Sequence, residues 1–238
     1  MHWATCTLRH VAASALEEAE RMQLLLSIAI GGQESVSDWV NVAGSSALHW
    51  FQLSEGLCGP DTSKHWSPND IDIFCCNAIA RTDDGFARYV NDSIARIVSF
   101  GCTVERVTQY KNRYIDDEEE VMVVRVKLCH VDTALSFVQR PNHNTVTEVM
   151  EEFDINVCKV LYRVHGRDSD GGGALEVRPS IGNAIRAREA SCKTFRFRSH
   201  TPTCLEIDKL ECTLFRMQKY AKRGFFFVNY PRIQSEQP

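Results

Sequence analysis

Apolar residues recur at helical spacing in several stretches of the chain. In the clearest stretch, 84–100, an apolar residue returns every three or four positions, which predicts an amphipathic helix that ends at Gly101. The residues expected to face inward are Phe86, Val90, Ile94, Ile97 and Val98. The same spacing predicts further helices over 12–30, 45–52, 144–153, 180–190 and 205–222.

Strand-like stretches lie between these helices. DIDIFCC at 70–76 alternates polar and apolar residues, and DWVNVAG at 38–44 is a short apolar run that ends in glycine. Helices and strands mixed in this order predict an α/β (α+β) fold, a mixed β-sheet with flanking helices. Further strands are expected over 102–109, 120–130, 134–139 and 154–164.

These elements suggest three parts of the chain: an N-terminal helical segment (1–37), a core (38–164) and a C-terminal helical extension (165–238). The core holds most of the predicted strands. In the helix 45–52, Trp50 is expected in the hydrophobic core and His49 on the surface.

Composition narrows the class of protein. Hydrophobic residues make up 44% of the 238 and charged residues 24%, which is ordinary for a globular protein, and the net charge of −4 provides no global field for nucleic acid. The ten cysteines form no C-x-x-C pair, so we expect no zinc site. No signal peptide is visible and LLLSIAI is too short to cross a bilayer, so we expect an intracellular, cytoplasmic protein without a membrane partner.

Two carboxylates stand side by side in the predicted strand 70–76. Residues i and i+2 of a strand share a face, so Asp70 and Asp72 project together while Ile71 and Ile73 face the other way. Two ionised carboxylates at this spacing repel each other, and a shared proton or a bound cation relieves the repulsion. Hard divalent ions such as Mg²⁺ take oxygen ligands of this kind.

Asp154, at the start of the predicted strand 154–164, is a third acid in a similar setting. If that strand lies beside 70–76, three carboxylates converge on one spot and could hold two metal ions for phosphoryl chemistry. Each signal alone has a plainer interpretation, since an Asp-x-Asp is more often a solvated strand face or turn, and Asp154 could be a cap.

The residues Gly44, Ser45 and Ser46 lie between a predicted strand and a predicted helix. Glycine lets a phosphate approach the backbone, and the helix N-terminus offers N–H groups to an anion. A turn with a serine cap is the plainer interpretation. An anion site close to a cation site suits a nucleotide that carries a metal on its phosphates.

In this order VAGSSALHWF, SPNDIDIF and EEFDINVCKVLY resemble the nucleotidyltransferase superfold, the polymerase-beta-like family. The chain is similar to poorly characterised members from protists and large DNA viruses. The resemblance covers roughly residues 38 to 164, and it implies a nucleotidyltransferase-like core there.

The family pattern implies a role for each matching residue. Asp70 and Asp72 would bind two Mg²⁺ (or Mn²⁺) ions, and Asp154 would help to hold one of them and activate the acceptor hydroxyl. Gly44 and Ser45, with Ser46 beside them, would bind the triphosphate. Competitors of Asp154 for the third acidic position are Glu151 and Glu152.

The predicted helix 205–222 and the residue after it carry a basic face, because Arg216, Lys219 and Arg223 recur three or four positions apart. On one interpretation Arg216 and Lys219 bind the nucleotide phosphates; on the other, the face is simply solvated. The apolar stripe of this helix is expected at Leu210, Leu214, Met217 and Ala221.

Two hypotheses of function follow. The first is a metal-dependent nucleotidyltransferase that moves a nucleoside monophosphate from a nucleoside triphosphate to an acceptor, which could be a protein, an RNA or a small molecule. The alternative is a catalytically inactive nucleotidyltransferase-fold module for binding or interaction. The sequence does not indicate the oligomeric state.

Overall fold

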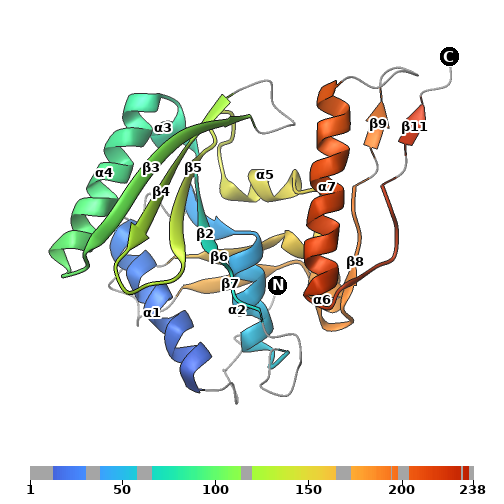
Figure 1. The fold of residues 1–238 in the computed structure, drawn as a ribbon, viewed down its shortest axis with the longest axis horizontal. Helices are drawn as coiled ribbons and strands as arrows, with labels where there is room; N and C mark the ends of the chain where they lie inside the picture. The colour runs from blue at the N-terminus through green and yellow to red at the C-terminus, as the bar shows by residue number, and fades with distance from the viewer. Residues whose placement is uncertain are drawn as a thin grey trace.

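The computed structural model describes residues 13–30, 38–57, 66–113, 120–164, 173–193, 195–197, 204–231 and 233–235. Within them, a central seven-stranded sheet has the order β3-β4-β5-β2-β1-β6-β7 (Figure 1). β2 and β5 run parallel, and the other neighbouring pairs of these seven strands run antiparallel. The strands are β1 (Val40–Ala43), β2 (Asp70–Cys75), β3 (Val104–Arg113), β4 (Glu120–Leu128), β5 (Ala134–Gln139), β6 (Val160–Arg163) and β7 (Ala174–Val177).

Helices flank this sheet, so the predicted mixed α/β architecture is confirmed. Figure 1 shows α1 and α4 at one end of the sheet and α7 at the other, with α5 between them. The helical elements are α1 (Ala13–Ile30), α2 (Ser45–Ser54), α3 (Asn77–Ala80), α4 (Asp83–Ser99), α5 (Val146–Glu151), the 3₁₀ turn η2 (Asn156–Cys158), α6 (Pro179–Arg186) and α7 (Cys204–Lys222).

The two faces of β2 pack against different surroundings. Ile71 and Ile73 are 1% and 0% exposed in the large core, to which α1, α2 and α4 contribute. Phe74 points the other way, into a smaller cluster with Val146 and Val149 of α5. The predicted alternation along 70–76 is therefore confirmed, and Asp72 shares the face of Phe74 because it lies two positions before it.

Helix α4 agrees closely with its prediction. Thr82 caps it by accepting a hydrogen bond from the Gly85 N–H at 3.1 Å, and Phe86, Val90 and Ile97 are buried. The expectation for Val98 was wrong, since this side chain is 50% exposed. One residue past Ile97 is a rotation of about 100° around the helix, which carries Val98 out of the buried stripe.

Helix α2 is buried along nearly all its length, which corrects one expectation. Trp50 is 4% exposed, as predicted, but His49 is only 6% exposed and its ring lies 4.8 Å from that of Trp66. The prediction of a surface histidine was wrong because α2 packs on four strands of the sheet, β1, β2, β6 and β7, and contacts η2, while the Trp66 ring lies against His49.

The prediction of one strand over 154–164 was also wrong. Asp154 lies in a bend, the turn η2 follows, and β6 begins only at Val160. The side chain of Asn156 accepts a hydrogen bond from the Ser191 N–H at 2.7 Å, and its own N–H donates to the Ser191 carbonyl at 3.0 Å. Contacts with a distant segment therefore shape this stretch, and the local apolar pattern does not report them.

Beyond residue 164 the structure has more strand than predicted. β7 pairs with β6 at the edge of the sheet. Two parallel pairs lie near α7: β8 (Glu189–Ala190) with β10 (Phe226–Phe227), and β9 (Phe195–Phe197) with β11 (Ile233–Ser235). The division of the chain into segments 1–37, 38–164 and 165–238 stays a prediction.

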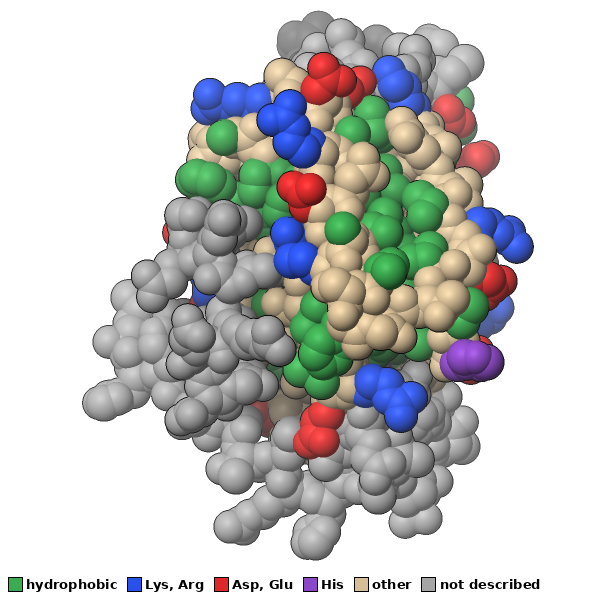
Figure 2. All heavy atoms as spheres, turned by 90° about the vertical axis from the view of Figure 1, so that its left-hand side faces the viewer, with side chains coloured by type: hydrophobic (Ala, Val, Ile, Leu, Met, Phe, Trp, Pro, Cys, Tyr) green, Lys and Arg blue, Asp and Glu red, His purple; other side chains and the backbone are tan. Residues whose placement is uncertain are grey.

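The end of the molecule that carries α4 and the edge strand β3 mixes apolar and charged side chains of both signs (Figure 2). Among the helices in the described residues, none combines the length and the apolar character that a membrane span requires. The exposed large apolar residues of α4, its C-cap and β3 are Val98, Phe100, Val107 and Tyr110.

Candidate functional site

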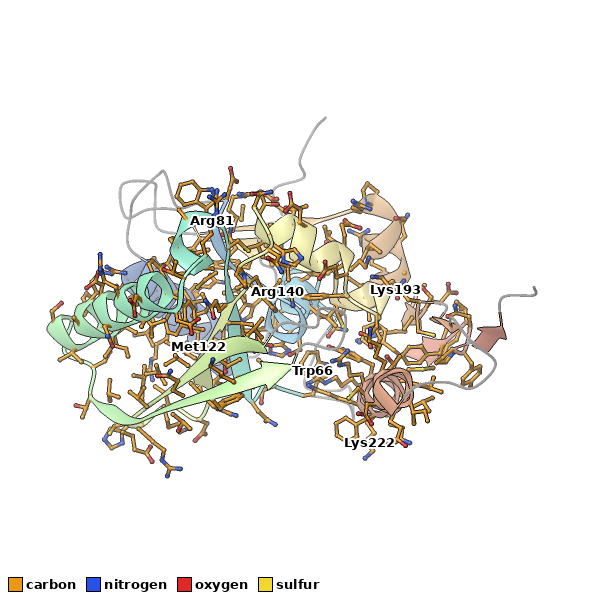
Figure 3. The ribbon with its side chains drawn as sticks, turned by 90° about the horizontal axis from the view of Figure 1, so that it is seen from above. Trp66, Arg81, Met122, Arg140, Lys193 and Lys222 are labelled. Carbon is orange, nitrogen blue, oxygen red and sulfur yellow. The ribbon has the colours of Figure 1, made fainter. Side chains whose placement is uncertain are left out.

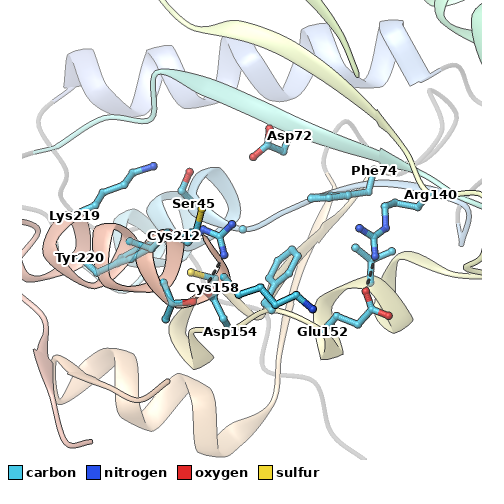
Figure 4. Close-up of a pocket in the computed structure, with 16 residues that line it drawn as sticks. Ser45, Asp72, Phe74, Arg140, Glu152, Asp154, Cys158, Cys212, Lys219 and Tyr220 are labelled. Carbon is cyan, nitrogen blue, oxygen red and sulfur yellow. Dashed lines mark hydrogen bonds and ion pairs between the residues drawn. The ribbon is translucent and has the colours of Figure 1, made fainter. Parts of the chain in front are cut away.

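A pocket with a volume of about 200 Å³ opens between the sheet, α5 and α7 (Figure 4). It lies on the face of β2 that carries Asp72 and Phe74, and both residues line it. Its other lining residues are Gly44, Ser45, Arg140, Val149, Glu152, Phe153, Asp154, Cys158, Lys209, Cys212, Thr213, Arg216, Lys219 and Tyr220.

The turn between β1 and α2 forms one corner of the pocket. Gly44 is the N-cap of α2 with φ 85° and ψ −138°, a backbone conformation that residues with a Cβ rarely adopt. No side chain caps the helix, which corrects the expected serine cap. The first turn of α2 therefore presents backbone N–H groups beside Ser45, as an anion site requires.

Ser46 has a different position from its neighbour. It is 1% exposed, and its hydroxyl donates a hydrogen bond to the Asp70 carbonyl at 2.7 Å. This bond ties the start of α2 to the start of β2, so it holds the glycine turn beside the acidic strand. Ser46 does not line the pocket, and neither does Asp70.

Helix α7 forms the wall opposite the sheet, and it turns a polar face toward the pocket. The buried residues of its inward side include Thr213, Met217 and Tyr220. Of the predicted apolar stripe, Met217 is buried and Leu210 is partly buried, whereas Leu214 is 41% exposed and Ala221 is exposed, so the prediction was wrong at Leu214 and Ala221. The residues of α7 in the pocket lining are Lys209, Cys212, Thr213, Arg216, Lys219 and Tyr220.

Asp154 is bonded to this helix. Its Oδ2 accepts a hydrogen bond from the Thr213 hydroxyl at 2.6 Å and another from Arg216 Nη1 at 2.7 Å. The Asp154 side chain is 14% exposed and that of Arg216 is 45% exposed. Both partners of the ion pair line the pocket, and the acidic partner is the more buried of the two.

The end of the pocket near α5 holds a second charged group. Arg140 is 3% exposed and forms an ion pair with Glu152, and His143 Nε2 lies 2.7 Å from Glu152 Oε1. Neither Arg140 nor His143 was predicted as a site residue. Glu152, weighed as a third acid, is paired here with Arg140 and lies within hydrogen-bonding distance of His143.

The pocket raises the pKa of one carboxyl group. Burial, and then the charge of Asp70, raise the pKa of Asp72 from 3.8 to about 7, against the opposing effects of Lys219, Arg125 and Arg216. A pair of crowded carboxylates with a retained proton is the arrangement that a divalent cation relieves, since it can displace the proton and neutralise both groups.

Lys219 responds to the same surroundings. Burial, and then the nearby Arg223, lower its pKa from 10.5, while Asp70, Cys158 and Asp72 oppose this change. An anion in the pocket would restore the ordinary preference of this lysine for its proton. The electrostatics of the sheet wall and of the helix wall are therefore coupled across the pocket.

A stack of side chains joins the end of α7 to the segment before β2. The Arg223 guanidinium carbon lies 3.6 Å from the centre of the Trp66 ring and 5.0 Å from that of Tyr220. Figure 3 shows Trp66 beside α7, which is seen end-on. Local sequence carried no signal for this stack, because 157 positions of chain separate Trp66 from Arg223.

The three predicted acids do not form one cluster. The neighbours of β2 are β1 and β5, whereas Asp154 precedes β6, which lies beyond β1. Figure 4 shows Asp72 and Asp154 on opposite sides of the pocket. In the described part of the chain, no three His, Cys, Asp or Glu side chains are grouped as a metal site. Of the three predicted acids, Asp70 and Asp72 share one face of β2, where adjacent carboxylate oxygens suit a divalent cation.

Comparisons with known proteins give likenesses in structure only. No family model and no curated protein matches the chain. The solved structures found include the Thermotoga maritima CCA-adding enzyme in complex with tRNA, with a TM-score of 0.48 and 12% identity over 92% of this chain and 40% of that one. A proposed nucleotidyltransferase from H. pylori has a TM-score of 0.31 and 11% identity, over 88% of this chain and 72% of that one.

A third structure, JHP933 from Helicobacter pylori, has a TM-score of 0.27 and 14% identity over 58% of this chain and 49% of that one. The match to the CCA-adding enzyme covers only 40% of the length of that enzyme. Likenesses at this level do not carry an activity.

Proposed function

We propose that the pocket binds a nucleoside triphosphate with a divalent metal ion and that the protein is a nucleotidyltransferase. The observation that carries this proposal is the meeting of three chemistries in one cavity. Asp72 supplies a carboxylate, the Gly44–Ser45 turn supplies backbone N–H groups, and Arg216 and Lys219 supply positive charge. Each of the three suits a different part of a metal-bound triphosphate.

Under this proposal, different residues would bind the metal ion and the phosphates. Asp70 and Asp72 would hold Mg²⁺ or Mn²⁺, which when bound supplies charge neutralisation at the transferring phosphoryl group. The first turn of α2 would hydrogen-bond phosphate oxygens, and Gly44 would let them approach the backbone. Lys219 and Arg216 would neutralise charge on the leaving pyrophosphate side. The acceptor, a hydroxyl of a protein, an RNA or a small molecule, would attack the α-phosphate.

A second candidate function is nucleotide binding without transfer. It is favoured by the bonding of Asp154 to Thr213 and Arg216, which places the third predicted acid in the opposite wall of the pocket. In the register of the sheet, the residue of β5 beside Asp72 is Ser136, which is not an acid. A site with two carboxylates could bind a metal-bound nucleotide and still lack the groups for rapid transfer.

Calorimetric titration tests the binding common to both functions. Each nucleoside triphosphate is titrated into the wild-type chain with Mg²⁺, with Mn²⁺ and with a chelator, and then into Asp72→Asn. Asp92→Asn is the matched control, because Asp92 is an exposed carboxylate of α4 outside the pocket lining. We expect metal-dependent binding that Asp72→Asn abolishes and Asp92→Asn preserves. Absence of binding to every triphosphate would overturn the proposal.

Pyrophosphate release separates the two functions. Wild-type protein is incubated with Mg²⁺ or Mn²⁺ and triphosphates labelled at the α-phosphate. The acceptors tested are the protein itself, RNA and small hydroxyl compounds. Label transfer with equimolar pyrophosphate release, lost in Asp72→Asn, supports the transferase. Tight metal-dependent binding without any release supports the binding module.

A further inference from the structure

The sequence around Asp154 resembles that of a metal ligand, but in the structure its side chain is bonded to helix α7. Its backbone is anchored, because its carbonyl accepts a hydrogen bond from the Lys193 N–H at 2.7 Å and the next residue, Ile155, is bridged to Cys192. Its side chain reaches α7, where one oxygen accepts two hydrogen bonds, from Thr213 and Arg216. The carboxylate is therefore oriented toward the helix by a fixed backbone.

The bonded oxygen of Asp154 argues against a shared metal ion. Asp154 and Asp72 lie on opposite sides of the pocket (Figure 4). Ligands of Mg²⁺ must lie about 2.1 Å from the ion. A carboxylate on the far side of the pocket, whose Oδ2 already accepts hydrogen bonds from Thr213 and Arg216, is poorly placed to complete the coordination by Asp70 and Asp72.

The strand on the other side of Asp72 offers no acid in its place. Asp72 is in register with Ser136 of β5, and Ser136 is in register with Arg125 of β4. Arg125 is close enough to act on the charge of Asp72. On that side of Asp70 and Asp72, the neighbouring strands therefore carry a serine hydroxyl and then an arginine.

We propose that Asp154 is a positioning residue for phosphate binding: it holds Arg216, and with it the cationic face of α7, at the pocket, while Asp70 and Asp72 hold the metal without it. This inference rests on the proposed function. It assigns the two walls of the pocket to different parts of the ligand, the sheet wall to the metal ion and the helix wall to the phosphates. Charge-assisted bonds from a fixed carboxylate pre-orient the arginine and so reduce the cost of ordering it on binding.

Two probes separate a positioning residue from a metal ligand. The first is Mn²⁺ alone, followed by the loss of the electron paramagnetic resonance signal of the free ion. The second is inorganic tripolyphosphate in the presence of a chelator, followed by calorimetry. Both are applied to the full chain as wild type, Asp72→Asn, Asp154→Asn, Arg216→Gln and the double variant Asp154→Asn/Arg216→Gln, with Asp92→Asn as control.

We expect opposite patterns for the two acids. Asp72→Asn should weaken Mn²⁺ binding at least about tenfold, whereas Asp154→Asn should change it less than about twofold. Asp154→Asn should weaken tripolyphosphate binding about tenfold, as should Arg216→Gln, because each removes one partner of a charge-assisted pair. The double variant should bind tripolyphosphate no more weakly than Arg216→Gln alone, since Asp154 acts through that arginine.

A loss of Mn²⁺ affinity in Asp154→Asn as large as that in Asp72→Asn would overturn the assignment, and so would unchanged tripolyphosphate binding. Thr213→Val serves if Asp154→Asn does not fold. It removes one of the two bonds to the carboxylate, and it should weaken tripolyphosphate binding about twofold to threefold without changing Mn²⁺ binding. If the wild-type chain binds neither probe, the proposed function itself fails, which is distinct from the failure of the Asp154 assignment alone.

Discussion

The two walls of the pocket are built in different ways. The sheet wall places the Gly44–Ser45 turn and Asp72 on strands whose opposite faces are sealed in the core, with Ile73 0% exposed. The helix wall is α7, which is held to that side by the Asp154–Arg216 pair and by the stack of Arg223 on Trp66. A wall of strands with acids faces a single helix with cations, which buries Met217 and Tyr220 in the core and adds these polar contacts on its pocket side. The first should resist perturbation and the second should respond to it.

The largest effect should come from the core behind the sheet wall. Ile73→Ala removes a fully buried side chain directly behind the acids and should lower the free energy of unfolding by about 2–5 kcal/mol. Leu214→Ala on the outer side of α7, where the side chain is 41% exposed, should cost less than about 1 kcal/mol. Urea unfolding of both variants measures the difference. Equal costs would contradict the contrast between the walls.

The acidic wall should also make stability depend on pH. The pKa of Asp72 rises from 3.8 in the unfolded chain to about 7 in the fold, so its contribution is full at low pH and is lost as the pH rises through 7. Between pH 5 and pH 8 without metal, we expect the free energy of unfolding to fall by roughly 1–3 kcal/mol through this group. Asp72→Asn should remove that fall, and Asp92→Asn should keep it. A wild-type stability that rises over this range, with no difference in Asp72→Asn, would contradict the prediction.

The glycine turn belongs to the sheet wall and should be sensitive to a single methyl group. A Cβ at Gly44 would have room, since its nearest neighbour would be the Phe153 ring at 3.8 Å, so the cost lies in the backbone conformation at φ 85°. Gly44→Ala should lower the free energy of unfolding by about 1–2 kcal/mol and weaken triphosphate binding. Gly56→Ala, at φ 66° and outside the pocket lining, is the control, with a stability cost but unchanged binding.

The smallest effect should come from the attachment of α7. Arg223→Gln removes the cation from between Trp66 and Tyr220 and should cost about 1 kcal/mol, the usual value of a partly desolvated cation–π contact. Hydrogen exchange should become faster in α7 and stay unchanged in β2, because only the helix loses an anchor. Faster exchange in β2 as well would show that the two walls open as one unit.

Prediction from sequence succeeded where the signal was local. The alternation along 70–76 correctly placed Ile71 and Ile73 in the core and Asp72 on the opposite face. The predicted Gly44–Ser45 turn does begin a helix beside that strand. Prediction failed at Asp154, which is not in a strand, and along α7, where Leu214 and Ala221 are exposed.

By itself, the sequence determined the mixed α/β class, the face of β2 that carries the acids and the turn before α2, because strand pleating and helix periodicity are local properties of the chain. Only the tertiary structure decided which charged side chains lie on each side of the pocket. Contacts with distant segments place Asp154 against α7, across the pocket from Asp72 (Figure 4), and the inward side of α7 combines buried Met217 and Tyr220 with the polar contacts to Asp154 and Trp66. An amphipathic pattern cannot report such contacts when polar groups make them, since it registers only apolar burial.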